Sequence, residues 1–367
     1  MNIAKKVIRG RIFDEFFKKG RPVNRIPVKK TASAIDFSSA NRRDFIKTLL
    51  LMGSVPLLAK RGLWAAKGQA KFEYKFATMP VGHFPEIQED IDKLRRENKL
   101  SRNATYLSYI DPKSRNFTVP GNFKNAKTLI VMAIAQPVLT VNFHHRGRVL
   151  PVIIPPGYYD DGNSRDDVMK TVREDIVRDP VARVEITGAP HMKLAAVRSG
   201  LGKYGRNNIC FVDGMGSFLA LYAFLTDHTF PEDHWSPLAM LPACKDCSIC
   251  YSACPTGAIT RENFVIDVGK CVTLYNEVAG EFPNFILPSM HNALMGCMKC
   301  QDKCPENEKY LSAKVKLEDV TEEETEKILK GTPDDALLKS MGRKLKGFGG
   351  SKESFPVFTR NLQPLLR

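Results

Sequence analysis

Residues 244–255 read Cys-Lys-Asp-Cys-Ser-Ile-Cys-Tyr-Ser-Ala-Cys-Pro. The four cysteines are separated by gaps of two, two and three residues, and Pro255 follows the last of them directly. This spacing is typical of bacterial proteins that bind [4Fe-4S] clusters, in which each iron takes one thiolate and a tight loop reaches several irons of one cube. The stretch therefore predicts an iron–sulfur domain in this half of the chain.

A second cysteine run lies at residues 297–305 and reads Cys-x2-Cys-x3-Cys-Pro, one cysteine short of the first. Cys271 supplies the missing member, so residues 272–296 are an insertion that opens the second motif. In two-cluster proteins the fourth cysteine of each run ligates the other cluster. We therefore expect cluster 1 on Cys244, Cys247, Cys250 and Cys304, and cluster 2 on Cys254, Cys271, Cys297 and Cys300.

Zinc and disulfides are the alternatives for these cysteines. Structural zinc sites usually pair two Cys-x2-Cys knuckles about 12–20 residues apart, and a longer run that occurs twice does not fit that arrangement. Disulfides would suit an exported chain, but the spacing favours clusters. The ninth cysteine, Cys210, lies between Ile209 and Phe211 and is expected to be a small buried hydrophobic residue.

The formal net charge of +15 over 367 residues suggests a nucleic-acid or polyanion binder. The charge is uneven, however. Residues 1–70 hold 16 basic and 4 acidic side chains, a net of +12, and the remaining residues hold 39 and 36, a net of +3. The basicity thus belongs mostly to a leader. No apolar run reaches the roughly 18 residues that a membrane-spanning helix needs, which excludes a polytopic membrane protein.

The leader resembles a twin-arginine export signal. Arg42 and Arg43 are followed by Phe45 and Lys47, and then by the apolar stretch 48–59. The alternative is the start of a buried helix, although the glycine and proline within that stretch disfavour one. Because the twin-arginine route carries folded cargo and clusters are inserted before export, the leader and the cysteine motifs agree. We expect the protein in the periplasm or on the outer face of the cytoplasmic membrane. A leader that is not cleaved would remain as a membrane anchor.

The segment before the clusters mixes helical and strand-like patterns, which predicts an α+β fold. The expected strands span 124–135, 208–214 and 217–227, and the expected helices span 166–177 and 189–200. The last two strands are expected to pair through a glycine-rich turn at 214–216. We divide the chain into a leader (1–70), an α/β catalytic or cofactor domain (71–235), a double-cluster domain (236–312) and a polar, partly helical C-terminal tail (313–367).

Gly200, Gly202 and Gly205 match the dinucleotide-binding pattern Gly-x-Gly-x-x-Gly. The motif follows a helical pattern and precedes a strand pattern, the reverse of the order in nicotinamide-binding folds. Binding of a nicotinamide cofactor is therefore not expected. The glycines are instead expected to let the loop press its backbone against a neighbouring segment or a flat ligand.

Residues 194–208, with the turn 214–217, the pair Thr226-Asp227 and the eight cysteines, resemble epoxyqueuosine reductases and the related reductive dehalogenases. The resemblance covers roughly residues 120–312. It implies a nitroreductase-like, corrinoid-binding domain followed by a two-cluster ferredoxin-like domain. It also implies that electrons pass through both clusters to a base-off cobalamin, and that Gly200, Gly202, Gly205 and Thr187 lie at the corrinoid.

Two departures from the reductases stand out. Thr187 occupies the position of their proton-donating aspartate, and their C-terminal helical repeats, which read tRNA, are missing here. With export, these departures predict no nucleic-acid partner. The remaining candidate catalytic groups are Tyr158, Tyr204 and Arg206, since a tyrosine beside a cation can deliver a proton. Each of these three residues also suits a structural role. His191 and the pair His144-His145 are more typical of hydrogen-bonded core histidines or of surface histidines than of catalytic or metal-binding ones.

We therefore expect an exported iron–sulfur oxidoreductase, in which two [4Fe-4S] clusters pass electrons to a substrate-reducing centre, a corrinoid, in residues 71–235. The alternative is an electron-transfer subunit without its own substrate chemistry. The missing acid at Thr187 favours the alternative, and the retained glycine-rich loop favours the enzyme. The expected partners are a small-molecule substrate, the twin-arginine translocase, and an electron donor, either a membrane quinol or cytochrome system or a ferredoxin-like protein.

Overall fold

The computed structural model describes residues 72–367 except 112–115, 161, 164, 189, 262–264 and 313. The expected twin-arginine leader lies outside the described residues, so export to the periplasm stays a prediction. In the described part of the chain, no helix has the length and apolar character that crossing a membrane requires.

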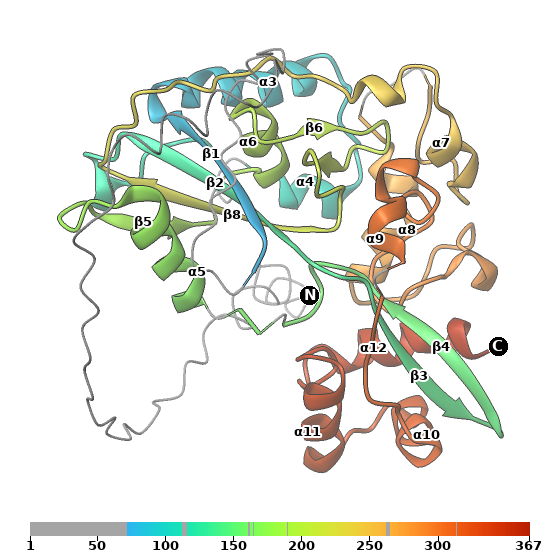
Figure 1. Cartoon of the computed structure of the whole chain (residues 1–367). Helices are drawn as coiled ribbons and strands as arrows, with labels where there is room; N and C mark the ends of the chain where they lie inside the picture. The colour runs from blue at the N-terminus through green and yellow to red at the C-terminus, as the bar shows by residue number, and fades with distance from the viewer. Residues whose placement is uncertain are drawn as a thin grey trace, which may run out of the picture. The chain divides into compact units, whose positions relative to one another are not determined.

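A four-stranded antiparallel sheet forms the first half of the fold (Figure 1). Its order is β1 (Tyr74–Pro80), β2 (Thr128–Ala135), β8 (Leu219–Thr226) and β5 (Val184–Thr187). Seven of the eight residues of β2 are buried, because this central strand is covered on both faces. A strand buried on both faces is apolar throughout, which explains the continuous apolar run that predicted it.

Alternate residues of β2 enter two different cores. Leu129 and Val131 pack with α3 (Phe84–Arg96) and α6 (Met192–Arg198) on one face of the sheet. Ile130 and Met132 pack on the other face with α5 (Arg165–Thr171) and the π-helical turn Val172–Val177. This division follows from the two-residue period of a strand. Figure 1 shows α3 and α6 on one side of the sheet and α5 on the other.

The predicted pairing of segments 208–214 and 217–227 is wrong. The first segment forms only the short strand β7 (Cys210–Phe211), which pairs with β6 (Lys203–Tyr204). Both edges of β8 are occupied, by β2 and by β5. Only a bridge between Val212 and Gly216 closes the expected turn.

The double-cluster region consists of short helices and turns at one end of this sheet (Figure 1). Its helices are α7 (Ile249–Ala253), α8 (Val272–Glu277) and α9 (Glu308–Leu311). One further helix of the first half, α4 (Ala104–Tyr109), lies before β2 in the chain. The 3-10 turns of the chain are Val81–His83, Gly121–Phe123, Pro242–Cys244, Val268–Lys270, Pro288–Met290, Pro305–Asn307 and Gln363–Leu366.

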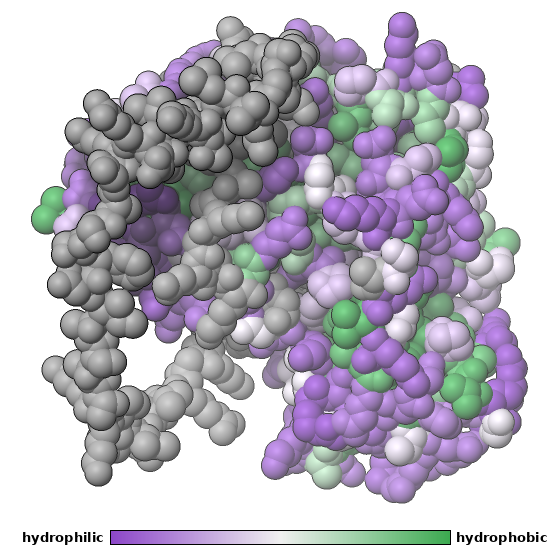
Figure 2. All heavy atoms as spheres, viewed as in Figure 1, coloured by the Kyte–Doolittle hydropathy of each residue, from purple (hydrophilic) through white to green (hydrophobic). Residues whose placement is uncertain are grey.

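Residues 314–367 build a second core around a hairpin from the first half of the chain. The hairpin pairs β3 (Leu139–His145) with β4 (Arg148–Ile154), and β9 (Val315–Lys316) adds to β3 in parallel. Helices α10 (Glu322–Lys330), α11 (Asp335–Lys344) and α12 (Phe355–Leu362) bury apolar side chains against it, and Phe358 of α12 packs in the same core as Phe143 of β3. In the face shown in Figure 2, the described surface is mainly hydrophilic, with apolar side chains in small groups.

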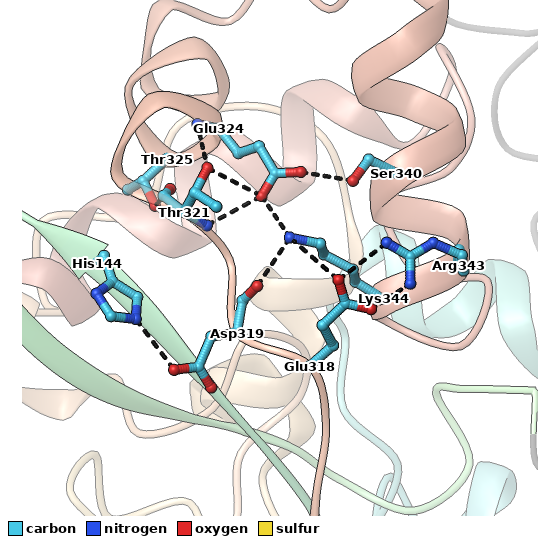
Figure 3. A network of polar contacts seen from close by, with 9 residues as sticks. All are labelled: His144, Glu318, Asp319, Thr321, Glu324, Thr325, Ser340, Arg343 and Lys344. Atoms are coloured by element: carbon cyan, nitrogen blue, oxygen red, sulfur yellow. Dashed lines mark hydrogen bonds and ion pairs between the residues drawn. The ribbon is translucent and has the colours of Figure 1, made fainter.

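A buried lysine connects α10, α11 and the strand that precedes them (Figure 3). The Lys344 side chain is only 6% exposed and donates hydrogen bonds to the Glu324 carboxylate, at 2.7 Å, and to the Asp319 carbonyl oxygen, at 2.8 Å. Burial opposes ionisation of Glu324, but its hydrogen bonds, that of Lys344 foremost, outweigh this and lower its pKa from 4.5 to about 2. The folded state therefore favours the ionised pair.

Replacing Lys344 with Met should lower the free energy of unfolding by about 3 kcal/mol, because Glu324, whose side chain is only 18% exposed, would be left without its cation. Since the pKa of Glu324 is depressed on folding, the stability it contributes is present above pH 4.5 and is lost as the pH falls towards about 2. Denaturant unfolding at pH 7 and at pH 3 measures both effects, and the difference between the variants should shrink at the lower pH.

Arg343→Met is the matched control. Arg343 lies in the same helix as Lys344 and pairs with Glu318, but its side chain is 62% exposed, so its loss should cost much less stability than the loss of Lys344. Equal losses in the two variants would contradict the role of burial.

Candidate iron–sulfur centre and adjoining cavity

A small hollow collects the four cysteines expected for cluster 1. Three of them come from the first run and the fourth, Cys304, from the second. The remaining wall, which includes Gly205, Arg206 and Phe211, comes from the glycine-rich loop and the strand after it. We call this space the cluster 1 hollow; its cysteines are Cys244, Cys247, Cys250 and Cys304.

A much larger cavity, of about 710 Å³, collects the four cysteines expected for cluster 2. Here Cys254 comes from the first run, and Cys271 comes from the beginning of α8. Cys297 and Cys300 complete the set. We call this space the main cavity. The structure thus places the cysteines in the two sets expected from their spacing, with Cys254 and Cys304 exchanged between the runs.

The donor chemistry of both spaces fits iron–sulfur clusters. Among the described residues, no three His, Cys, Asp or Glu side chains gather closely enough to hold one shared metal ion. Each set of thiols instead surrounds a space, as a cube with one iron per thiolate requires. Burial raises the pKa of Cys300 well above its usual value and that of Cys304 to about 11, so bound iron is needed to keep these thiols ionised.

The three glycines of the glycine-rich loop pack against protein and do not line the main cavity. A Cβ atom at Gly202 would lie 2.7 Å from the Cys210 sulfur, and one at Gly205 would lie 2.6 Å from the Phe211 ring. Gly200 has a φ of +75° and packs against residues 234–236. The walls of the two spaces include Gly205, in the cluster 1 hollow, but neither Gly200 nor Gly202.

Thr187 and Arg206 also lie away from the main cavity. Thr187 is the last residue of β5 and pairs with Ala223 in the sheet. The Arg206 guanidinium donates hydrogen bonds to the carbonyl oxygens of Cys244, at 2.7 Å, and Cys247, at 3.2 Å. Arg206 therefore holds the loop that carries three ligands of cluster 1 and places a positive charge beside it.

Four polar side chains meet the main cavity near the cluster 2 cysteines. The Tyr158 hydroxyl donates a hydrogen bond to the Glu277 carboxylate. The Lys193 ammonium donates to the Asn208 carbonyl oxygen at 2.8 Å, and Tyr204 is a buried part of the wall. Sequence reasoning missed Glu277 and Lys193. The position of Glu277 in the short helix that begins after Cys271 is a signal that could have indicated it.

Burial sets the protonation of these groups. Burial raises the pKa of Tyr158 well above its usual value, and the negative charge of Glu277 raises it further. Burial also raises the pKa of Glu277. It lowers the pKa of Lys193. Tyr158 is thus a protonated donor at neutral pH, held in one direction by its hydrogen bond.

Residues 243–307 match the family described as the 4Fe-4S double cluster binding domain. The chain is 29% identical over 189 residues to the epoxyqueuosine reductase of Staphylococcus aureus, covering 50% of this chain and 48% of the relative. It is 35% identical over 127 residues to that of Leadbetterella byssophila, covering 34% and 40%. The chain thus spans about half the length, or less, of these curated relatives.

Solved epoxyqueuosine reductases share the fold. The structure from Bacillus subtilis matches with a TM-score of 0.54 and 18% identity, covering 79% of this chain and 76% of that one. An epoxyqueuosine reductase with an epoxyqueuosine-modified tRNA stem loop matches with a TM-score of 0.56 and 17% identity, with the same coverage. A catabolic reductive dehalogenase matches with a TM-score of only 0.32 and 15% identity, covering 64% and 32%.

These relatives confirm the predicted resemblance and the [4Fe-4S] domain, and they correct two other predictions. The function of an exported electron relay, with an electron-transfer subunit as the alternative, is wrong, because the matched relatives are reductases named for a tRNA nucleoside. The prediction that the protein has no nucleic-acid partner is also wrong, because one solved relative is a complex with a tRNA stem loop. The chain is therefore similar to the epoxyqueuosine reductases and matches a 4Fe-4S double cluster binding domain at residues 243–307.

Proposed function

We propose that this chain is a reductase of the epoxyqueuosine reductase kind, which removes the epoxide oxygen of a modified nucleoside presented by an RNA. The observation that carries the proposal is the shared wall of the main cavity. The cysteines assigned to cluster 2 and the pair Tyr158–Glu277 border the same space, so electrons and protons reach one place. The volume of about 710 Å³ lies in the range of small-molecule sites.

The reaction needs two electrons and two protons for each epoxide, and it yields an alkene and water. Cluster 2 borders the main cavity and cluster 1 lies in a separate hollow, so we assign electron entry to cluster 1 and delivery to cluster 2. Tyr158 donates a proton to the oxygen that leaves carbon, while the Lys193 charge stabilises the negative charge that develops on it. Glu277 orients the Tyr158 hydroxyl.

The nitroreductase-like description of the first domain and a corrinoid in the main cavity are also part of this proposal. The antiparallel sheet with helices on both faces supports the first. For the second, the apolar wall that includes Met192, Leu194 and Leu219 suits the face of a macrocycle beside cluster 2. A bound corrinoid would supply a strongly reducing cobalt centre. Gly202 would then support the wall from behind, because it packs against Cys210.

The test is an assay of the full-length protein, purified without oxygen from a corrinoid-producing host. Two clusters predict about eight irons per chain, and the corrinoid proposal predicts one cobalt. With a chemical reductant and an epoxyqueuosine-modified tRNA stem loop, mass spectrometry should detect the loss of one oxygen atom from the nucleoside. The unmodified stem loop is the control. An iron-loaded, reduced protein that leaves the modified nucleoside unchanged would refute the proposed reaction.

A further inference from the structure

The insertion between Cys271 and Cys297 places one side-chain amide against a cluster 2 sulfur. The Asn292 amide nitrogen, Nδ2, lies 3.1 Å from the Cys297 sulfur and 3.2 Å from the Met290 carbonyl oxygen. Its amide oxygen, Oδ1, accepts a hydrogen bond from the Met298 backbone N–H at 2.7 Å. The side chain therefore spans the end of the insertion and the loop that carries the ligand.

The direction of this amide follows from its partners. A backbone N–H can only donate, so the atom that faces Met298 must be the amide oxygen. A carbonyl oxygen such as that of Met290 can only accept, so the atom that faces it must be the NH2 group. Both contacts agree, and the NH2 group consequently points a hydrogen at the Cys297 sulfur.

The cluster 2 cysteines receive further side-chain hydrogen bonds. The Thr256 hydroxyl lies 3.7 Å from the Cys254 sulfur, and the Thr273 side chain hydrogen-bonds Cys271. At the cluster 1 hollow, Cys250 and Cys304 are hydrogen-bonded by backbone groups, those of Tyr251 and Glu306. Backbone groups, those of Thr273 and Lys299, also hydrogen-bond Cys271 and Cys297, so the cluster 2 cysteines receive side-chain donors in addition to backbone donors.

We infer that Asn292 is a positioning residue that raises the reduction potential of cluster 2. A hydrogen bond to a thiolate withdraws negative charge from the cluster and stabilises its reduced, more negative form. The higher reduction potential belongs to the cluster that borders the main cavity. It therefore favours reduction of that cluster, next to the place where the substrate is reduced. The inference rests on the proposed assignment of Cys297 to cluster 2 and on the proposed function.

Anaerobic redox titration of the full-length protein, followed by electron paramagnetic resonance, tests this role. In Asn292→Leu, which has a similar size but no N–H, the reduction equilibrium of one cluster should fall about tenfold, a shift of about 59 mV for one electron. The other cluster should keep its potential. Asn292→Asp keeps an oxygen for the Met298 N–H, loses the donor and adds a charge, so its shift should be larger in the same direction.

Asn142→Leu is the matched control, since the Asn142 amide donates to Asp319 in the second core, outside both walls. It should leave both potentials unchanged. Full iron content with no shift in either Asn292 variant, or with equal shifts of both clusters, would overturn the inference. If Asn292→Leu loses iron, the Asp variant decides. A wild-type protein that never binds eight irons would instead overturn the cluster assignment beneath it, so the two failures are distinguishable.

Discussion

A Cys304→Ser protein should lose cluster 1 and keep cluster 2, although Cys304 belongs to the same cysteine run as two ligands of cluster 2. Cys304 lies in the wall of the cluster 1 hollow together with the first three cysteines of the other run. A serine hydroxyl is a much poorer ligand for iron than a thiolate, so the cube should be lost or left labile. Iron should fall from about eight to about four per chain, and reduction of the substrate should stop because cluster 1 is the proposed entry point.

The reciprocal variant makes the test decisive. Cys254→Ser should lose cluster 2, because Cys254 lies in the wall of the main cavity with the cysteines of the second run. Its electron paramagnetic resonance spectrum should match that of Cys297→Ser, whereas the spectrum of Cys304→Ser should match that of Cys244→Ser. Cys210→Ser, a change at the ninth cysteine, should keep both clusters. If the spectrum of Cys304→Ser instead matched that of Cys297→Ser, and that of Cys254→Ser matched that of Cys244→Ser, the exchange of ligands between the runs would be contradicted.

The cysteine sets could be predicted from the sequence because they follow from local geometry. Gaps of two residues form tight loops whatever the rest of the fold does, so neighbouring thiols of one run meet, and the known pattern of two-cluster proteins indicated the exchange of Cys254 and Cys304. The strand at 124–135 was predictable for a similar reason, since β2 is buried on both faces and its apolar run is continuous. Gly200, after α6, has the positive φ expected where a helix stops.

Long-range packing could not be predicted in the same way. Glu277 meets Tyr158 across 119 positions of sequence, and neither residue carries a signal that names the other. The partners of β8 depend on which edges are free in the assembled sheet. The segment after residue 313 is rich in charged residues, and the spacing of its apolar residues is typical of helices. These helices bury their apolar side chains against the β3–β4 hairpin, which lies far away in the sequence.

The prediction of no nucleic-acid partner rested on the expected export and on the departures from the reductases, and the low net charge of the body had weakened a polyanion-binding interpretation. A net charge of +3 over residues 71–367 describes the average of the body, whereas binding depends on charges gathered at one place. The replacement of an expected acid by Thr187 was also a weak argument. Tyr158 and Glu277 reach the main cavity from a different part of the chain, so the proposed proton donor does not depend on position 187.

Replacing Tyr158 with Phe should lower the rate of substrate reduction by about 100-fold or more while both clusters stay in place. General acid catalysis typically contributes about 10²–10⁴-fold, and the variant removes only the proposed donor. Burial keeps the pKa of Tyr158 well above its usual value, so the wild-type rate should not fall through loss of this proton as the pH rises from 7 to 9. Single-turnover assays with pre-reduced protein separate this step from electron delivery.

Tyr159→Phe is the matched control for this step. Tyr159 is the next residue in the chain, and its hydroxyl donates a hydrogen bond to the Pro137 carbonyl oxygen at 2.6 Å, outside the wall of the main cavity. Its loss should leave the rate nearly unchanged. Glu277→Gln keeps an oxygen that can accept from Tyr158, so it should lower the rate less than Tyr158→Phe does. If Glu277→Gln instead abolishes reduction while Tyr158→Phe is active, the carboxyl group of Glu277, whose pKa burial raises, is itself the acid, and Tyr158 only positions it.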